Sequence, residues 1–203
     1  LVGLNEHRSG NVLVNGKDIF SLTGKELKQM RKKIRYIFQD PYSSLDPTMK
    51  AGTAIMEPMI THDLYASADE RKKKVMQLLD LVGLRSDLYD RFPHELSGGQ
   101  RQRISIARAL ASEPEILICD ECVSSLDVSV QAQVLNLIND IKKEKDLTCL
   151  FISHDLSVVR HMSDRILIMK AGKIVEEGIP EVILNSPAHT YTKELLSSLP
   201  VIR

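Results

Sequence analysis

The sequence predicts an α/β fold in which helices cover a parallel sheet and a helical lobe is inserted partway along the chain. Short apolar runs bounded by turn residues, at 116–119 and 147–152, are typical of buried parallel strands. These runs alternate with longer stretches whose apolar residues recur at helical spacing. Between residues 41 and 115 only helical patterns occur, and we therefore expect a helical insertion there.

The composition excludes several classes of protein. With 203 residues, 43% of them hydrophobic and 27% charged, the chain can bury a core and is not expected to be disordered or fibrous. Lys and Arg together equal Asp and Glu at 27 each, so no basic field attracts nucleic acid. No apolar run reaches the ~18 residues of a membrane span. Three cysteines are too few for a disulfide framework, which favours a reducing, cytosolic compartment.

The first elements are a hairpin and a helix. Residues 12–14 predict a strand, and the following Asn15-Gly16 pair predicts a tight turn, because both residues tolerate positive φ. Thr23 and Glu26 match a capping box, which predicts the start of a helix.

A short strand and a loop come next. Residues 34–38 predict a strand that delivers Gln39 at its end. The Asp-Pro pairs at 40–41 and 46–47 predict an irregular loop, since a residue before proline is pushed out of helical geometry. We expect the helical lobe to begin here.

Two amphipathic helices are predicted within the lobe. Ser67 and Glu70 form a second capping box, and Gly83 is placed as the stop of that helix. Its apolar positions follow helical spacing: Val75, Leu78, Leu79 and Val82. A further helix is expected from Ser97 to about residue 111, before a proline at 114 ends the helical pattern.

The remainder of the chain alternates strands and helices. We expect a helix over 130–141, a buried strand over 147–152, and a closing pair of strands at 165–169 and 174–175. The expected organisation has four segments: an N-terminal part of the core at 1–40, the helical subdomain at 41–115, the rest of the core at 116–178, and a C-terminal helical tail at 179–203.

One candidate site lies at the start of the helix that begins near residue 97. Ser97 is placed to cap the helix, and Gly98 and Gly99 would let the backbone approach a ligand closely before Gln100. A helix start presents free N–H groups, which suits a phosphate. A simple loop before a helix explains the same residues about equally well.

A second candidate site lies where the apolar strands end. Asp120 and Glu121 follow the strand at 116–119, at the edge where α/β sheets bind ligands. There an Asp can hold Mg²⁺ and a Glu can activate water. His154 follows the strand at 147–152 and could donate a hydrogen bond to a γ-phosphate. The alternatives are a solvated strand end and a structural histidine.

Together these segments resemble the ATP-binding subunits of ABC transporters over nearly the whole chain. The resemblance implies a P-loop NTPase-like (RecA-like) core and the cofactors ATP and Mg²⁺. It also implies catalytic roles for Glu121 and His154 and metal contacts from Gln39 and Asp120. The residues implied to contact nucleotide match the Q-loop, the signature motif and the D-loop of the family: Gln39, Ser97, Gly98, Gly99, Gln100 and Asp127.

Finer features are similar to the oligopeptide, dipeptide and nickel importers, in the segments 38–47, 127–134 and 186–193. The implied partners are a second ATP-binding subunit, in a homo- or heterodimer, and membrane permease subunits, with a solute-binding protein engaged indirectly. The implied location is the cytoplasmic face of the cell membrane, as a peripheral subunit.

The sequence departs from the family pattern at its beginning. A P-loop needs G-x-x-x-x-G-K-[ST], and the Gly-Lys pairs at Gly16, Gly24 and Gly172 lack both the earlier glycine and the following hydroxyl residue. We therefore expect an N-terminally truncated subunit in which residues 1–4 are the tail of the P-loop helix. The alternative function is a non-catalytic fragment that pairs with an intact subunit or permease. ABC ATPases of DNA repair or translation gain no support from the charge.

A second departure is Cys122, where the family usually has proline. It creates a C-x-x-C pattern with Cys119, for which redox or zinc chemistry is the alternative to a structural role. We favour the structural role, because Cys119 is expected in a buried strand and only Cys149 remains as a third thiol.

Overall fold

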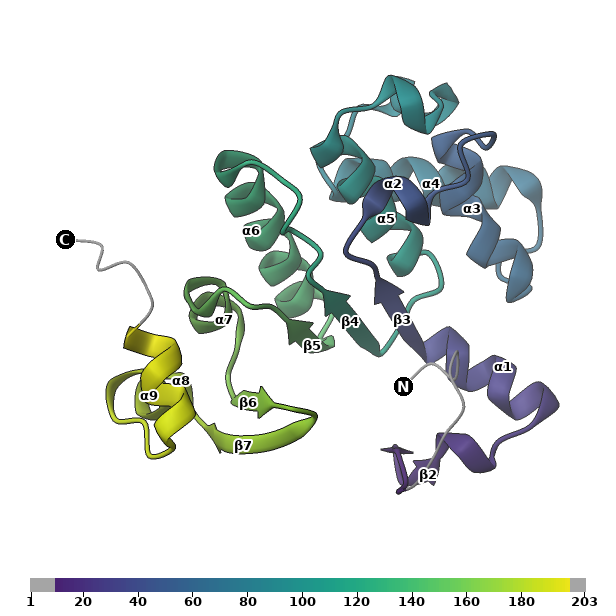
Figure 1. Ribbon diagram of the computed structural model, residues 1–203. Helices are drawn as coiled ribbons and strands as arrows, with labels where there is room; N and C mark the ends of the chain where they lie inside the picture. The colour runs from purple at the N-terminus through teal and green to yellow at the C-terminus, as the bar shows by residue number, and fades with distance from the viewer. Residues whose placement is uncertain (1–9, 198–203) are drawn as a thin grey trace. The chain divides into compact units, whose positions relative to one another are not determined.

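The computed structural model describes residues 10–197, and the chain divides into two compact units (Figure 1). One unit reaches to Leu150 and the other starts at Phe151. Each unit has its own buried apolar cluster. The expected helix end at residues 1–4 lies outside the described residues.

The first unit opens with the predicted hairpin. Strands β1 (Leu13–Val14) and β2 (Lys17–Asp18) pair antiparallel. Asn15 and Gly16 between them have φ of 50° and 76°, the positive values that a tight hairpin turn requires. The hairpin is thus confirmed, and the short helix η1 (Ile19–Ser21) follows it, capped by Asp18.

Helix α1 (Gly24–Lys33) begins where predicted, but the capping box does not form. The Thr23 side chain makes no cap hydrogen bond; instead its backbone carbonyl accepts from the N–H groups of Glu26 and Leu27. Gly24 has a φ of +52°, so the chain enters the helix by a left-handed residue. This entry presents the Thr23 carbonyl, rather than its hydroxyl, to the first turn.

The sheet at the centre of the first unit has the order β3-β4-β5. Strand β3 (Ile34–Ile37) pairs parallel with β4 (Ile116–Asp120), in a register that places Ile34 opposite Ile116 and Ile37 opposite Cys119. The predicted α/β fold with a parallel sheet is confirmed.

Strand β5 (Thr148–Ile152) lies on the other side of β4, and its last two residues begin the second unit. The prediction that this strand is buried is wrong, because Leu150 and Ile152 are 37% and 43% exposed. Within the sheet as described, β5 is the last strand.

The loop expected after Gln39 contains a short helix, α2 (Pro41–Ser44). Asp40 is extended, as expected for a residue before proline, and its carboxylate accepts from the Tyr42 N–H at 2.8 Å. Proline is tolerated at the first helical position, because its missing N–H would have no partner there. The prediction of a wholly irregular loop was therefore wrong for residues 41–44.

The segment between β3 and β4 is otherwise helical, as predicted. Its elements after α2 are α3 (Ala51–Thr61), α4 (Ala68–Leu81), η2 (Ser86–Asp90), η3 (Pro93–Glu95) and α5 (Gly98–Leu110). The capping box of Ser67 and Glu70 at the start of α4 is confirmed. The four apolar side chains expected on its inner face, Val75, Leu78, Leu79 and Val82, are all buried.

Helix α6 (Val128–Glu144) follows β4, and β5 follows α6. Figure 1 shows α6 beside β4, with α2 to α5 grouped beyond the end of β3. Both helix α6 and the strand β5 were predicted from sequence.

The second unit packs helices on an antiparallel pair of strands. Its elements are α7 (Leu156–Met162), β6 (Ile166–Lys170), β7 (Lys173–Gly178), α8 (Pro180–Asn185) and α9 (Thr190–Ser197). The turn at Ala171 and Gly172 confirms the predicted closing pair. Tyr191, Leu195 and Leu196 of α9 pack against the buried cluster of this unit.

Within residues 10–197, no helix combines the length and apolarity needed to cross a membrane.

Candidate nucleotide site

The ends of β3 and β4 bring two predicted site residues into contact. The Gln39 side chain donates from Nε2 to Glu121 Oε2 at 2.6 Å, although the two residues are 82 positions apart. The contact follows from the parallel pairing, because the carboxyl ends of both strands meet at one edge of the sheet. Asp120, the last residue of β4, precedes Glu121 at this edge. We call Gln39, Asp120 and Glu121 the acidic edge.

The backbone at Glu121 has an unusual conformation. Its φ is +45°, in the left-handed region that side-chain-bearing residues rarely adopt. The Glu121 carbonyl accepts hydrogen bonds from the Ser124 N–H at 3.0 Å and from the Ser124 hydroxyl at 2.9 Å, which close a tight turn. Cys122 and Val123 in this turn are buried and anchor it. The turn therefore holds Glu121 in a fixed backbone position at a cost of about 1–3 kcal/mol.

Sequence reasoning missed Tyr36, which contacts the acidic edge from within β3. Its hydroxyl donates to Asp120 Oδ2. Burial raises the pKa of Tyr36 to about 12, and the hydrogen bond to Asp120 adds to the shift. Tyr36 lies opposite Ile118, two residues before Asp120. The signal that could have revealed the contact is a tyrosine in a strand expected to pair beside the acidic one.

The N-terminus of α5 carries the other group of predicted residues. The Gln100 N–H donates to Ser97 Oγ at 3.3 Å, and the Ser97 N–H donates to Gln100 Oε1 at 2.9 Å, so the two side chains form a complete capping box. Both side chains thus serve the helix start. We call residues 97–100 the helix tip.

The two glycines of the helix tip face a neighbouring helix start. A Cβ built on Gly99 would lie 2.5 Å from Val130 Cγ1, and one built on Gly98 would lie 3.5 Å from Leu126 Cδ2. Gly99 is therefore required for close packing of α5 against α6, which is a steric reason independent of any ligand.

Asp127 caps the start of α6. Its carboxylate accepts from the Val130 N–H at 3.0 Å and from the Ser129 hydroxyl at 2.8 Å. These hydrogen bonds, the one from Val130 first, lower the pKa of Asp127. Because Gly99 contacts the first turn of α6, the starts of the two helices lie side by side.

Two arginines missed in the sequence tie the segment after Gln39 to α5. Arg108 donates from Nη1 to the Ser44 carbonyl at 2.7 Å, and burial lowers its pKa. The Arg101 guanidinium lies over the Tyr42 ring, 4.9 Å from its centroid. Both contacts join α2 to α5, so the segment that carries Gln39 is attached to the helix whose start is the helix tip.

His154 belongs to the second unit, and its relation to the acidic edge remains a prediction. The residue lies between β5 and α7. Its neighbour Asp155 caps α7 by accepting from the Ser157 N–H at 2.8 Å, while the Asp155 N–H donates to Ser153 Oγ at 3.0 Å. The local turn around His154 is thus well defined.

The three cysteine side chains lie close together next to the acidic edge. Cys119 and Cys122 are fully buried, and the sulfur atoms of Cys119 and Cys149 are 3.8 Å apart. Hydrogen bonds with Cys122 and Cys149, together with burial, raise the pKa of Cys119. No group of three His, Cys, Asp or Glu side chains within residues 10–197 has the arrangement of a metal site.

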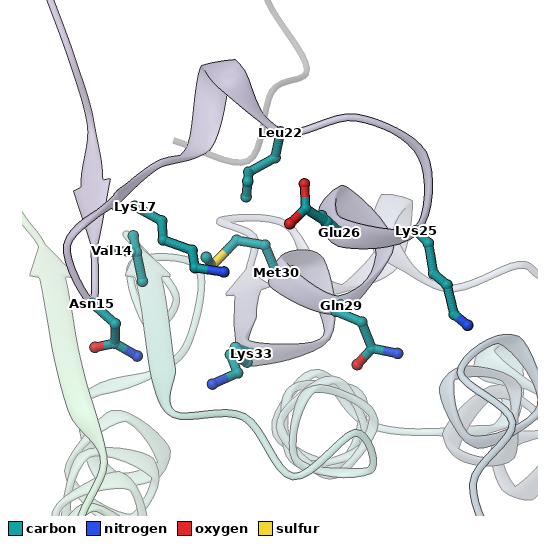
Figure 2. Close-up of a pocket in the computed structure, with 9 residues that line it drawn as sticks. All are labelled: Val14, Asn15, Lys17, Leu22, Lys25, Glu26, Gln29, Met30 and Lys33. Carbon is teal, nitrogen blue, oxygen red and sulfur yellow. The ribbon is translucent and has the colours of Figure 1, made fainter.

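A separate cavity of about 420 Å³ lies between the hairpin and α1 (Figure 2). Val14, Leu22 and Met30 contribute apolar surface, and Lys17, Lys25 and Lys33 contribute amino groups. None of the predicted site residues lines this cavity.

The donor atoms of the acidic edge fit a hard cation. The carboxylate of Asp120 and the amide oxygen of Gln39 are oxygen ligands of the kind that Mg²⁺ prefers. Gln39 uses its nitrogen for Glu121, which leaves its amide oxygen on the other branch of the side chain. The residues present therefore suit Mg²⁺.

The sequence of the chain is similar to the sequences of known proteins. Residues 1–124 match the family described as ABC transporter. The chain is 50% identical over 191 residues to the dipeptide transport ATP-binding protein DppF of Lactococcus lactis subsp. cremoris, covering 94% of this chain and 61% of that protein. It is also 50% identical over 204 residues to the oligopeptide transport ATP-binding protein AppF of Bacillus subtilis, covering 100% and 62%. The chain thus spans about three fifths of the length of these relatives.

Solved structures agree with this assignment. A dimeric ATP-binding cassette in a post-hydrolysis state, bound to ADP and Pi, matches with a TM-score of 0.77 and 30% identity, over 87% of this chain and 76% of that one. CbiO1 from Clostridium perfringens, part of an ABC transporter complex, matches with a TM-score of 0.78 and 28% identity, over 90% and 70%. Matching segments, shared fold and sequence identity together place this chain in the ABC transporter family.

Proposed function

We propose that this chain is the ATP-hydrolysing part of a transporter subunit that energises the import of oligopeptides, dipeptides or a related solute. The relatives named above are dipeptide and oligopeptide transport ATP-binding proteins. The observation that carries the catalytic part of the proposal is the 2.6 Å hydrogen bond between Gln39 and Glu121, which joins two expected site residues from distant parts of the chain.

Glu121 acts as the general base in this proposal. Its carboxylate accepts a proton from the water that attacks the γ-phosphate, and the hydrogen bond from Gln39 orients the carboxylate. The fixed turn at residues 121–124 limits the motion of Glu121, so proton transfer starts from a defined position.

Asp120 and Gln39 are the residues that would hold Mg²⁺. When bound, the ion supplies positive charge that offsets the charge of the phosphate groups. His154 donates a hydrogen bond to the γ-phosphate and steadies it during transfer.

The helix tip serves a nucleotide held between two subunits. Ser97 and Gln100 close the helix start with their capping box, and Gly98 and Gly99 present backbone N–H groups at the positive end of α5, which suits the γ-phosphate of an ATP bound mainly by a partner subunit. Asp127 lies at the adjacent helix start and would face the same nucleotide. This arrangement implies a homo- or heterodimer of ATP-binding subunits.

The remaining partners follow from the same proposal. Membrane permease subunits would bind the ATP-binding subunit at the cytoplasmic face of the membrane, and a solute-binding protein would act through the permease. The chain would be peripheral.

Glu121→Gln is the direct test, because it keeps the side-chain size and removes the basic oxygen. ATP hydrolysis would be measured for the chain with Mg²⁺, alone and mixed with a full-length oligopeptide-type ATP-binding subunit. Loss of the general base should lower the hydrolysis rate about 10²–10⁴-fold. An unchanged rate in both settings would refute the catalytic role of Glu121.

The mixture also separates the alternative of a non-catalytic fragment. If only Ser97→Ala lowers the rate of the mixture, and Glu121→Gln does not, the chain completes a partner's site without performing the chemistry itself. Ser67→Ala is the matched control, because it removes the same kind of cap from α4.

A further inference from the structure

Tyr36 occupies a position from which it can link the core to the acidic edge. Its ring packs against a buried cluster formed by Val14, Ile19, Met30, Ile34 and Ile118. The ring also lies 4.5 Å from the Phe38 ring, centroid to centroid, with an interplanar angle of 41°. These contacts restrict the χ1 rotamer of Tyr36, so its hydroxyl oxygen has a defined place.

The hydroxyl of Tyr36 donates to Oδ2 of Asp120. The two residues are diagonal neighbours across β3 and β4, because Tyr36 lies opposite Ile118 and Asp120 is two residues further along the same strand. Side chains on one face of a sheet alternate with a period of two residues, so Ile118 and Asp120 point to the same face. A long aromatic side chain can span this diagonal.

A carboxylate at a strand end can otherwise rotate about its χ angles and turn toward water. A hydrogen bond to one oxygen stops this rotation and leaves the second oxygen, Oδ1, in a defined place. Hydrogen bonds of this kind, made to a metal ligand rather than to the metal, orient the ligand and raise its affinity for the ion.

We propose that Tyr36 is a positioning residue for Asp120, fixing the carboxylate so that its other oxygen is ready to hold a divalent cation. The proposal rests on the proposed function, since it assumes that Asp120 is a metal ligand. It extends that function by adding a residue of β3 to the machinery around the cation.

The test is Mn²⁺ binding by the whole chain, with Mn²⁺ alone as the probe and electron paramagnetic resonance as the measurement. Tyr36→Phe removes the hydroxyl and keeps the ring in its packing. We expect this variant to bind Mn²⁺ about tenfold more weakly than the unaltered chain. Tyr65→Phe is the matched control, because Tyr65 also donates its hydroxyl to a carboxylate, that of Glu113 at 2.7 Å, in another part of the unit. The control should bind Mn²⁺ as tightly as the unaltered chain.

Asp120→Asn and the double variant separate the two proposals. If Asp120→Asn binds Mn²⁺ as the unaltered chain does, Asp120 is not a ligand and both the metal assignment and the role of Tyr36 are overturned. If Asp120→Asn weakens binding but Tyr36→Phe does not, only the role of Tyr36 is overturned. Added to Asp120→Asn, Tyr36→Phe should cause no further loss; a further loss of the same size would show that Tyr36 acts elsewhere and would also overturn the proposal.

Discussion

The acidic edge and the helix tip are built by different kinds of contact. Tyr36 in β3 contacts Asp120, and Gln39 just after β3 contacts Glu121, each across more than 80 positions of sequence. The helix tip is closed by its own residues, since Ser97 and Gln100 cap each other three positions apart.

This difference separates long-range from local organisation. The acidic edge exists only when β3 and β4 pair in the observed register, so its geometry depends on the tertiary fold. The helix tip is specified largely by adjacent residues and then docked on α6 through Gly99. Variants of each region should therefore affect stability by different routes.

The largest effect on stability is expected where the helix tip packs against α6. Gly99→Ala places a Cβ 2.5 Å from Val130 Cγ1, so overpacking should lower the free energy of unfolding by about 2 kcal/mol, measured by urea denaturation. In Gly98→Ala the new Cβ would lie 3.5 Å from Leu126 Cδ2, an ordinary van der Waals contact. This variant should change the free energy of unfolding by less than about 0.5 kcal/mol. Equal effects of the two variants would contradict the packing argument; adding Val130→Ala should restore most of the Gly99→Ala loss.

The next largest effect on stability concerns the hydrogen bond between Tyr36 and Asp120. Tyr36→Phe removes a half-buried hydrogen bond to a carboxylate and should lower the free energy of unfolding by about 1.5 kcal/mol. Gln39→Ala removes an exposed hydrogen bond and should cost no more than about 0.5 kcal/mol. Urea denaturation of both variants checks this order, and a larger loss for Gln39→Ala would reverse our ranking of the two contacts.

A somewhat smaller loss of stability is expected when a helix cap is removed. Ser97→Ala and Ser67→Ala each break a complete capping box, so each should lower the free energy of unfolding by about 1 kcal/mol. Thr23→Ala removes a side chain that makes no cap hydrogen bond and should cost well under about 0.5 kcal/mol. Thermal or urea unfolding of the three variants measures this contrast, which fails if Thr23→Ala is as costly as the other two.

The smallest effect is a pH dependence at the start of α6. Hydrogen bonds from Val130 and Ser129 lower the pKa of Asp127 below the ordinary value of 3.8 for an aspartate. The stability that they provide is therefore present above that value and is lost as the pH falls through the lower pKa of the folded state. Asp127→Asn keeps a capping side chain but does not titrate, so its stability should fall less than that of the unaltered chain between pH 5 and the acid limit of folding. Parallel stability profiles for the two proteins would contradict this prediction.

Local patterns in the sequence predicted a large part of the fold. The hairpin at Asn15-Gly16, the capping box at Ser67 and the helix that starts after Ser97 each depend on residues within four positions of one another. Thr23 shows the limit of such patterns. The side-chain cap did not form there, and Gly24, which follows Thr23, has a positive φ that the motif does not specify.

The chemistry at the strand ends was identified by residue type, but its contacts were not. The sequence indicated Gln39, Asp120 and Glu121 as separate candidates, whereas the hydrogen bond between Gln39 and Glu121 depends on the register of β3 and β4. Tyr36 and Arg108 were missed for the same reason: a side chain that acts across the fold has no partner at a fixed spacing in sequence.

The sequence by itself determined the order of strands and helices, the helix tip and the acidic strand end, because turns, caps and apolar periodicity are set by near neighbours. Only the tertiary structure decided that Glu121 takes a left-handed backbone, that Gly99 must lack a side chain to admit Val130, and that Tyr36 holds Asp120. The last two features arise when distant segments pack against each other, and the turn at Glu121 depends on the burial of Cys122 and Val123 as well as on the local hydrogen bonds from Ser124. No local pattern in the sequence specifies such packing.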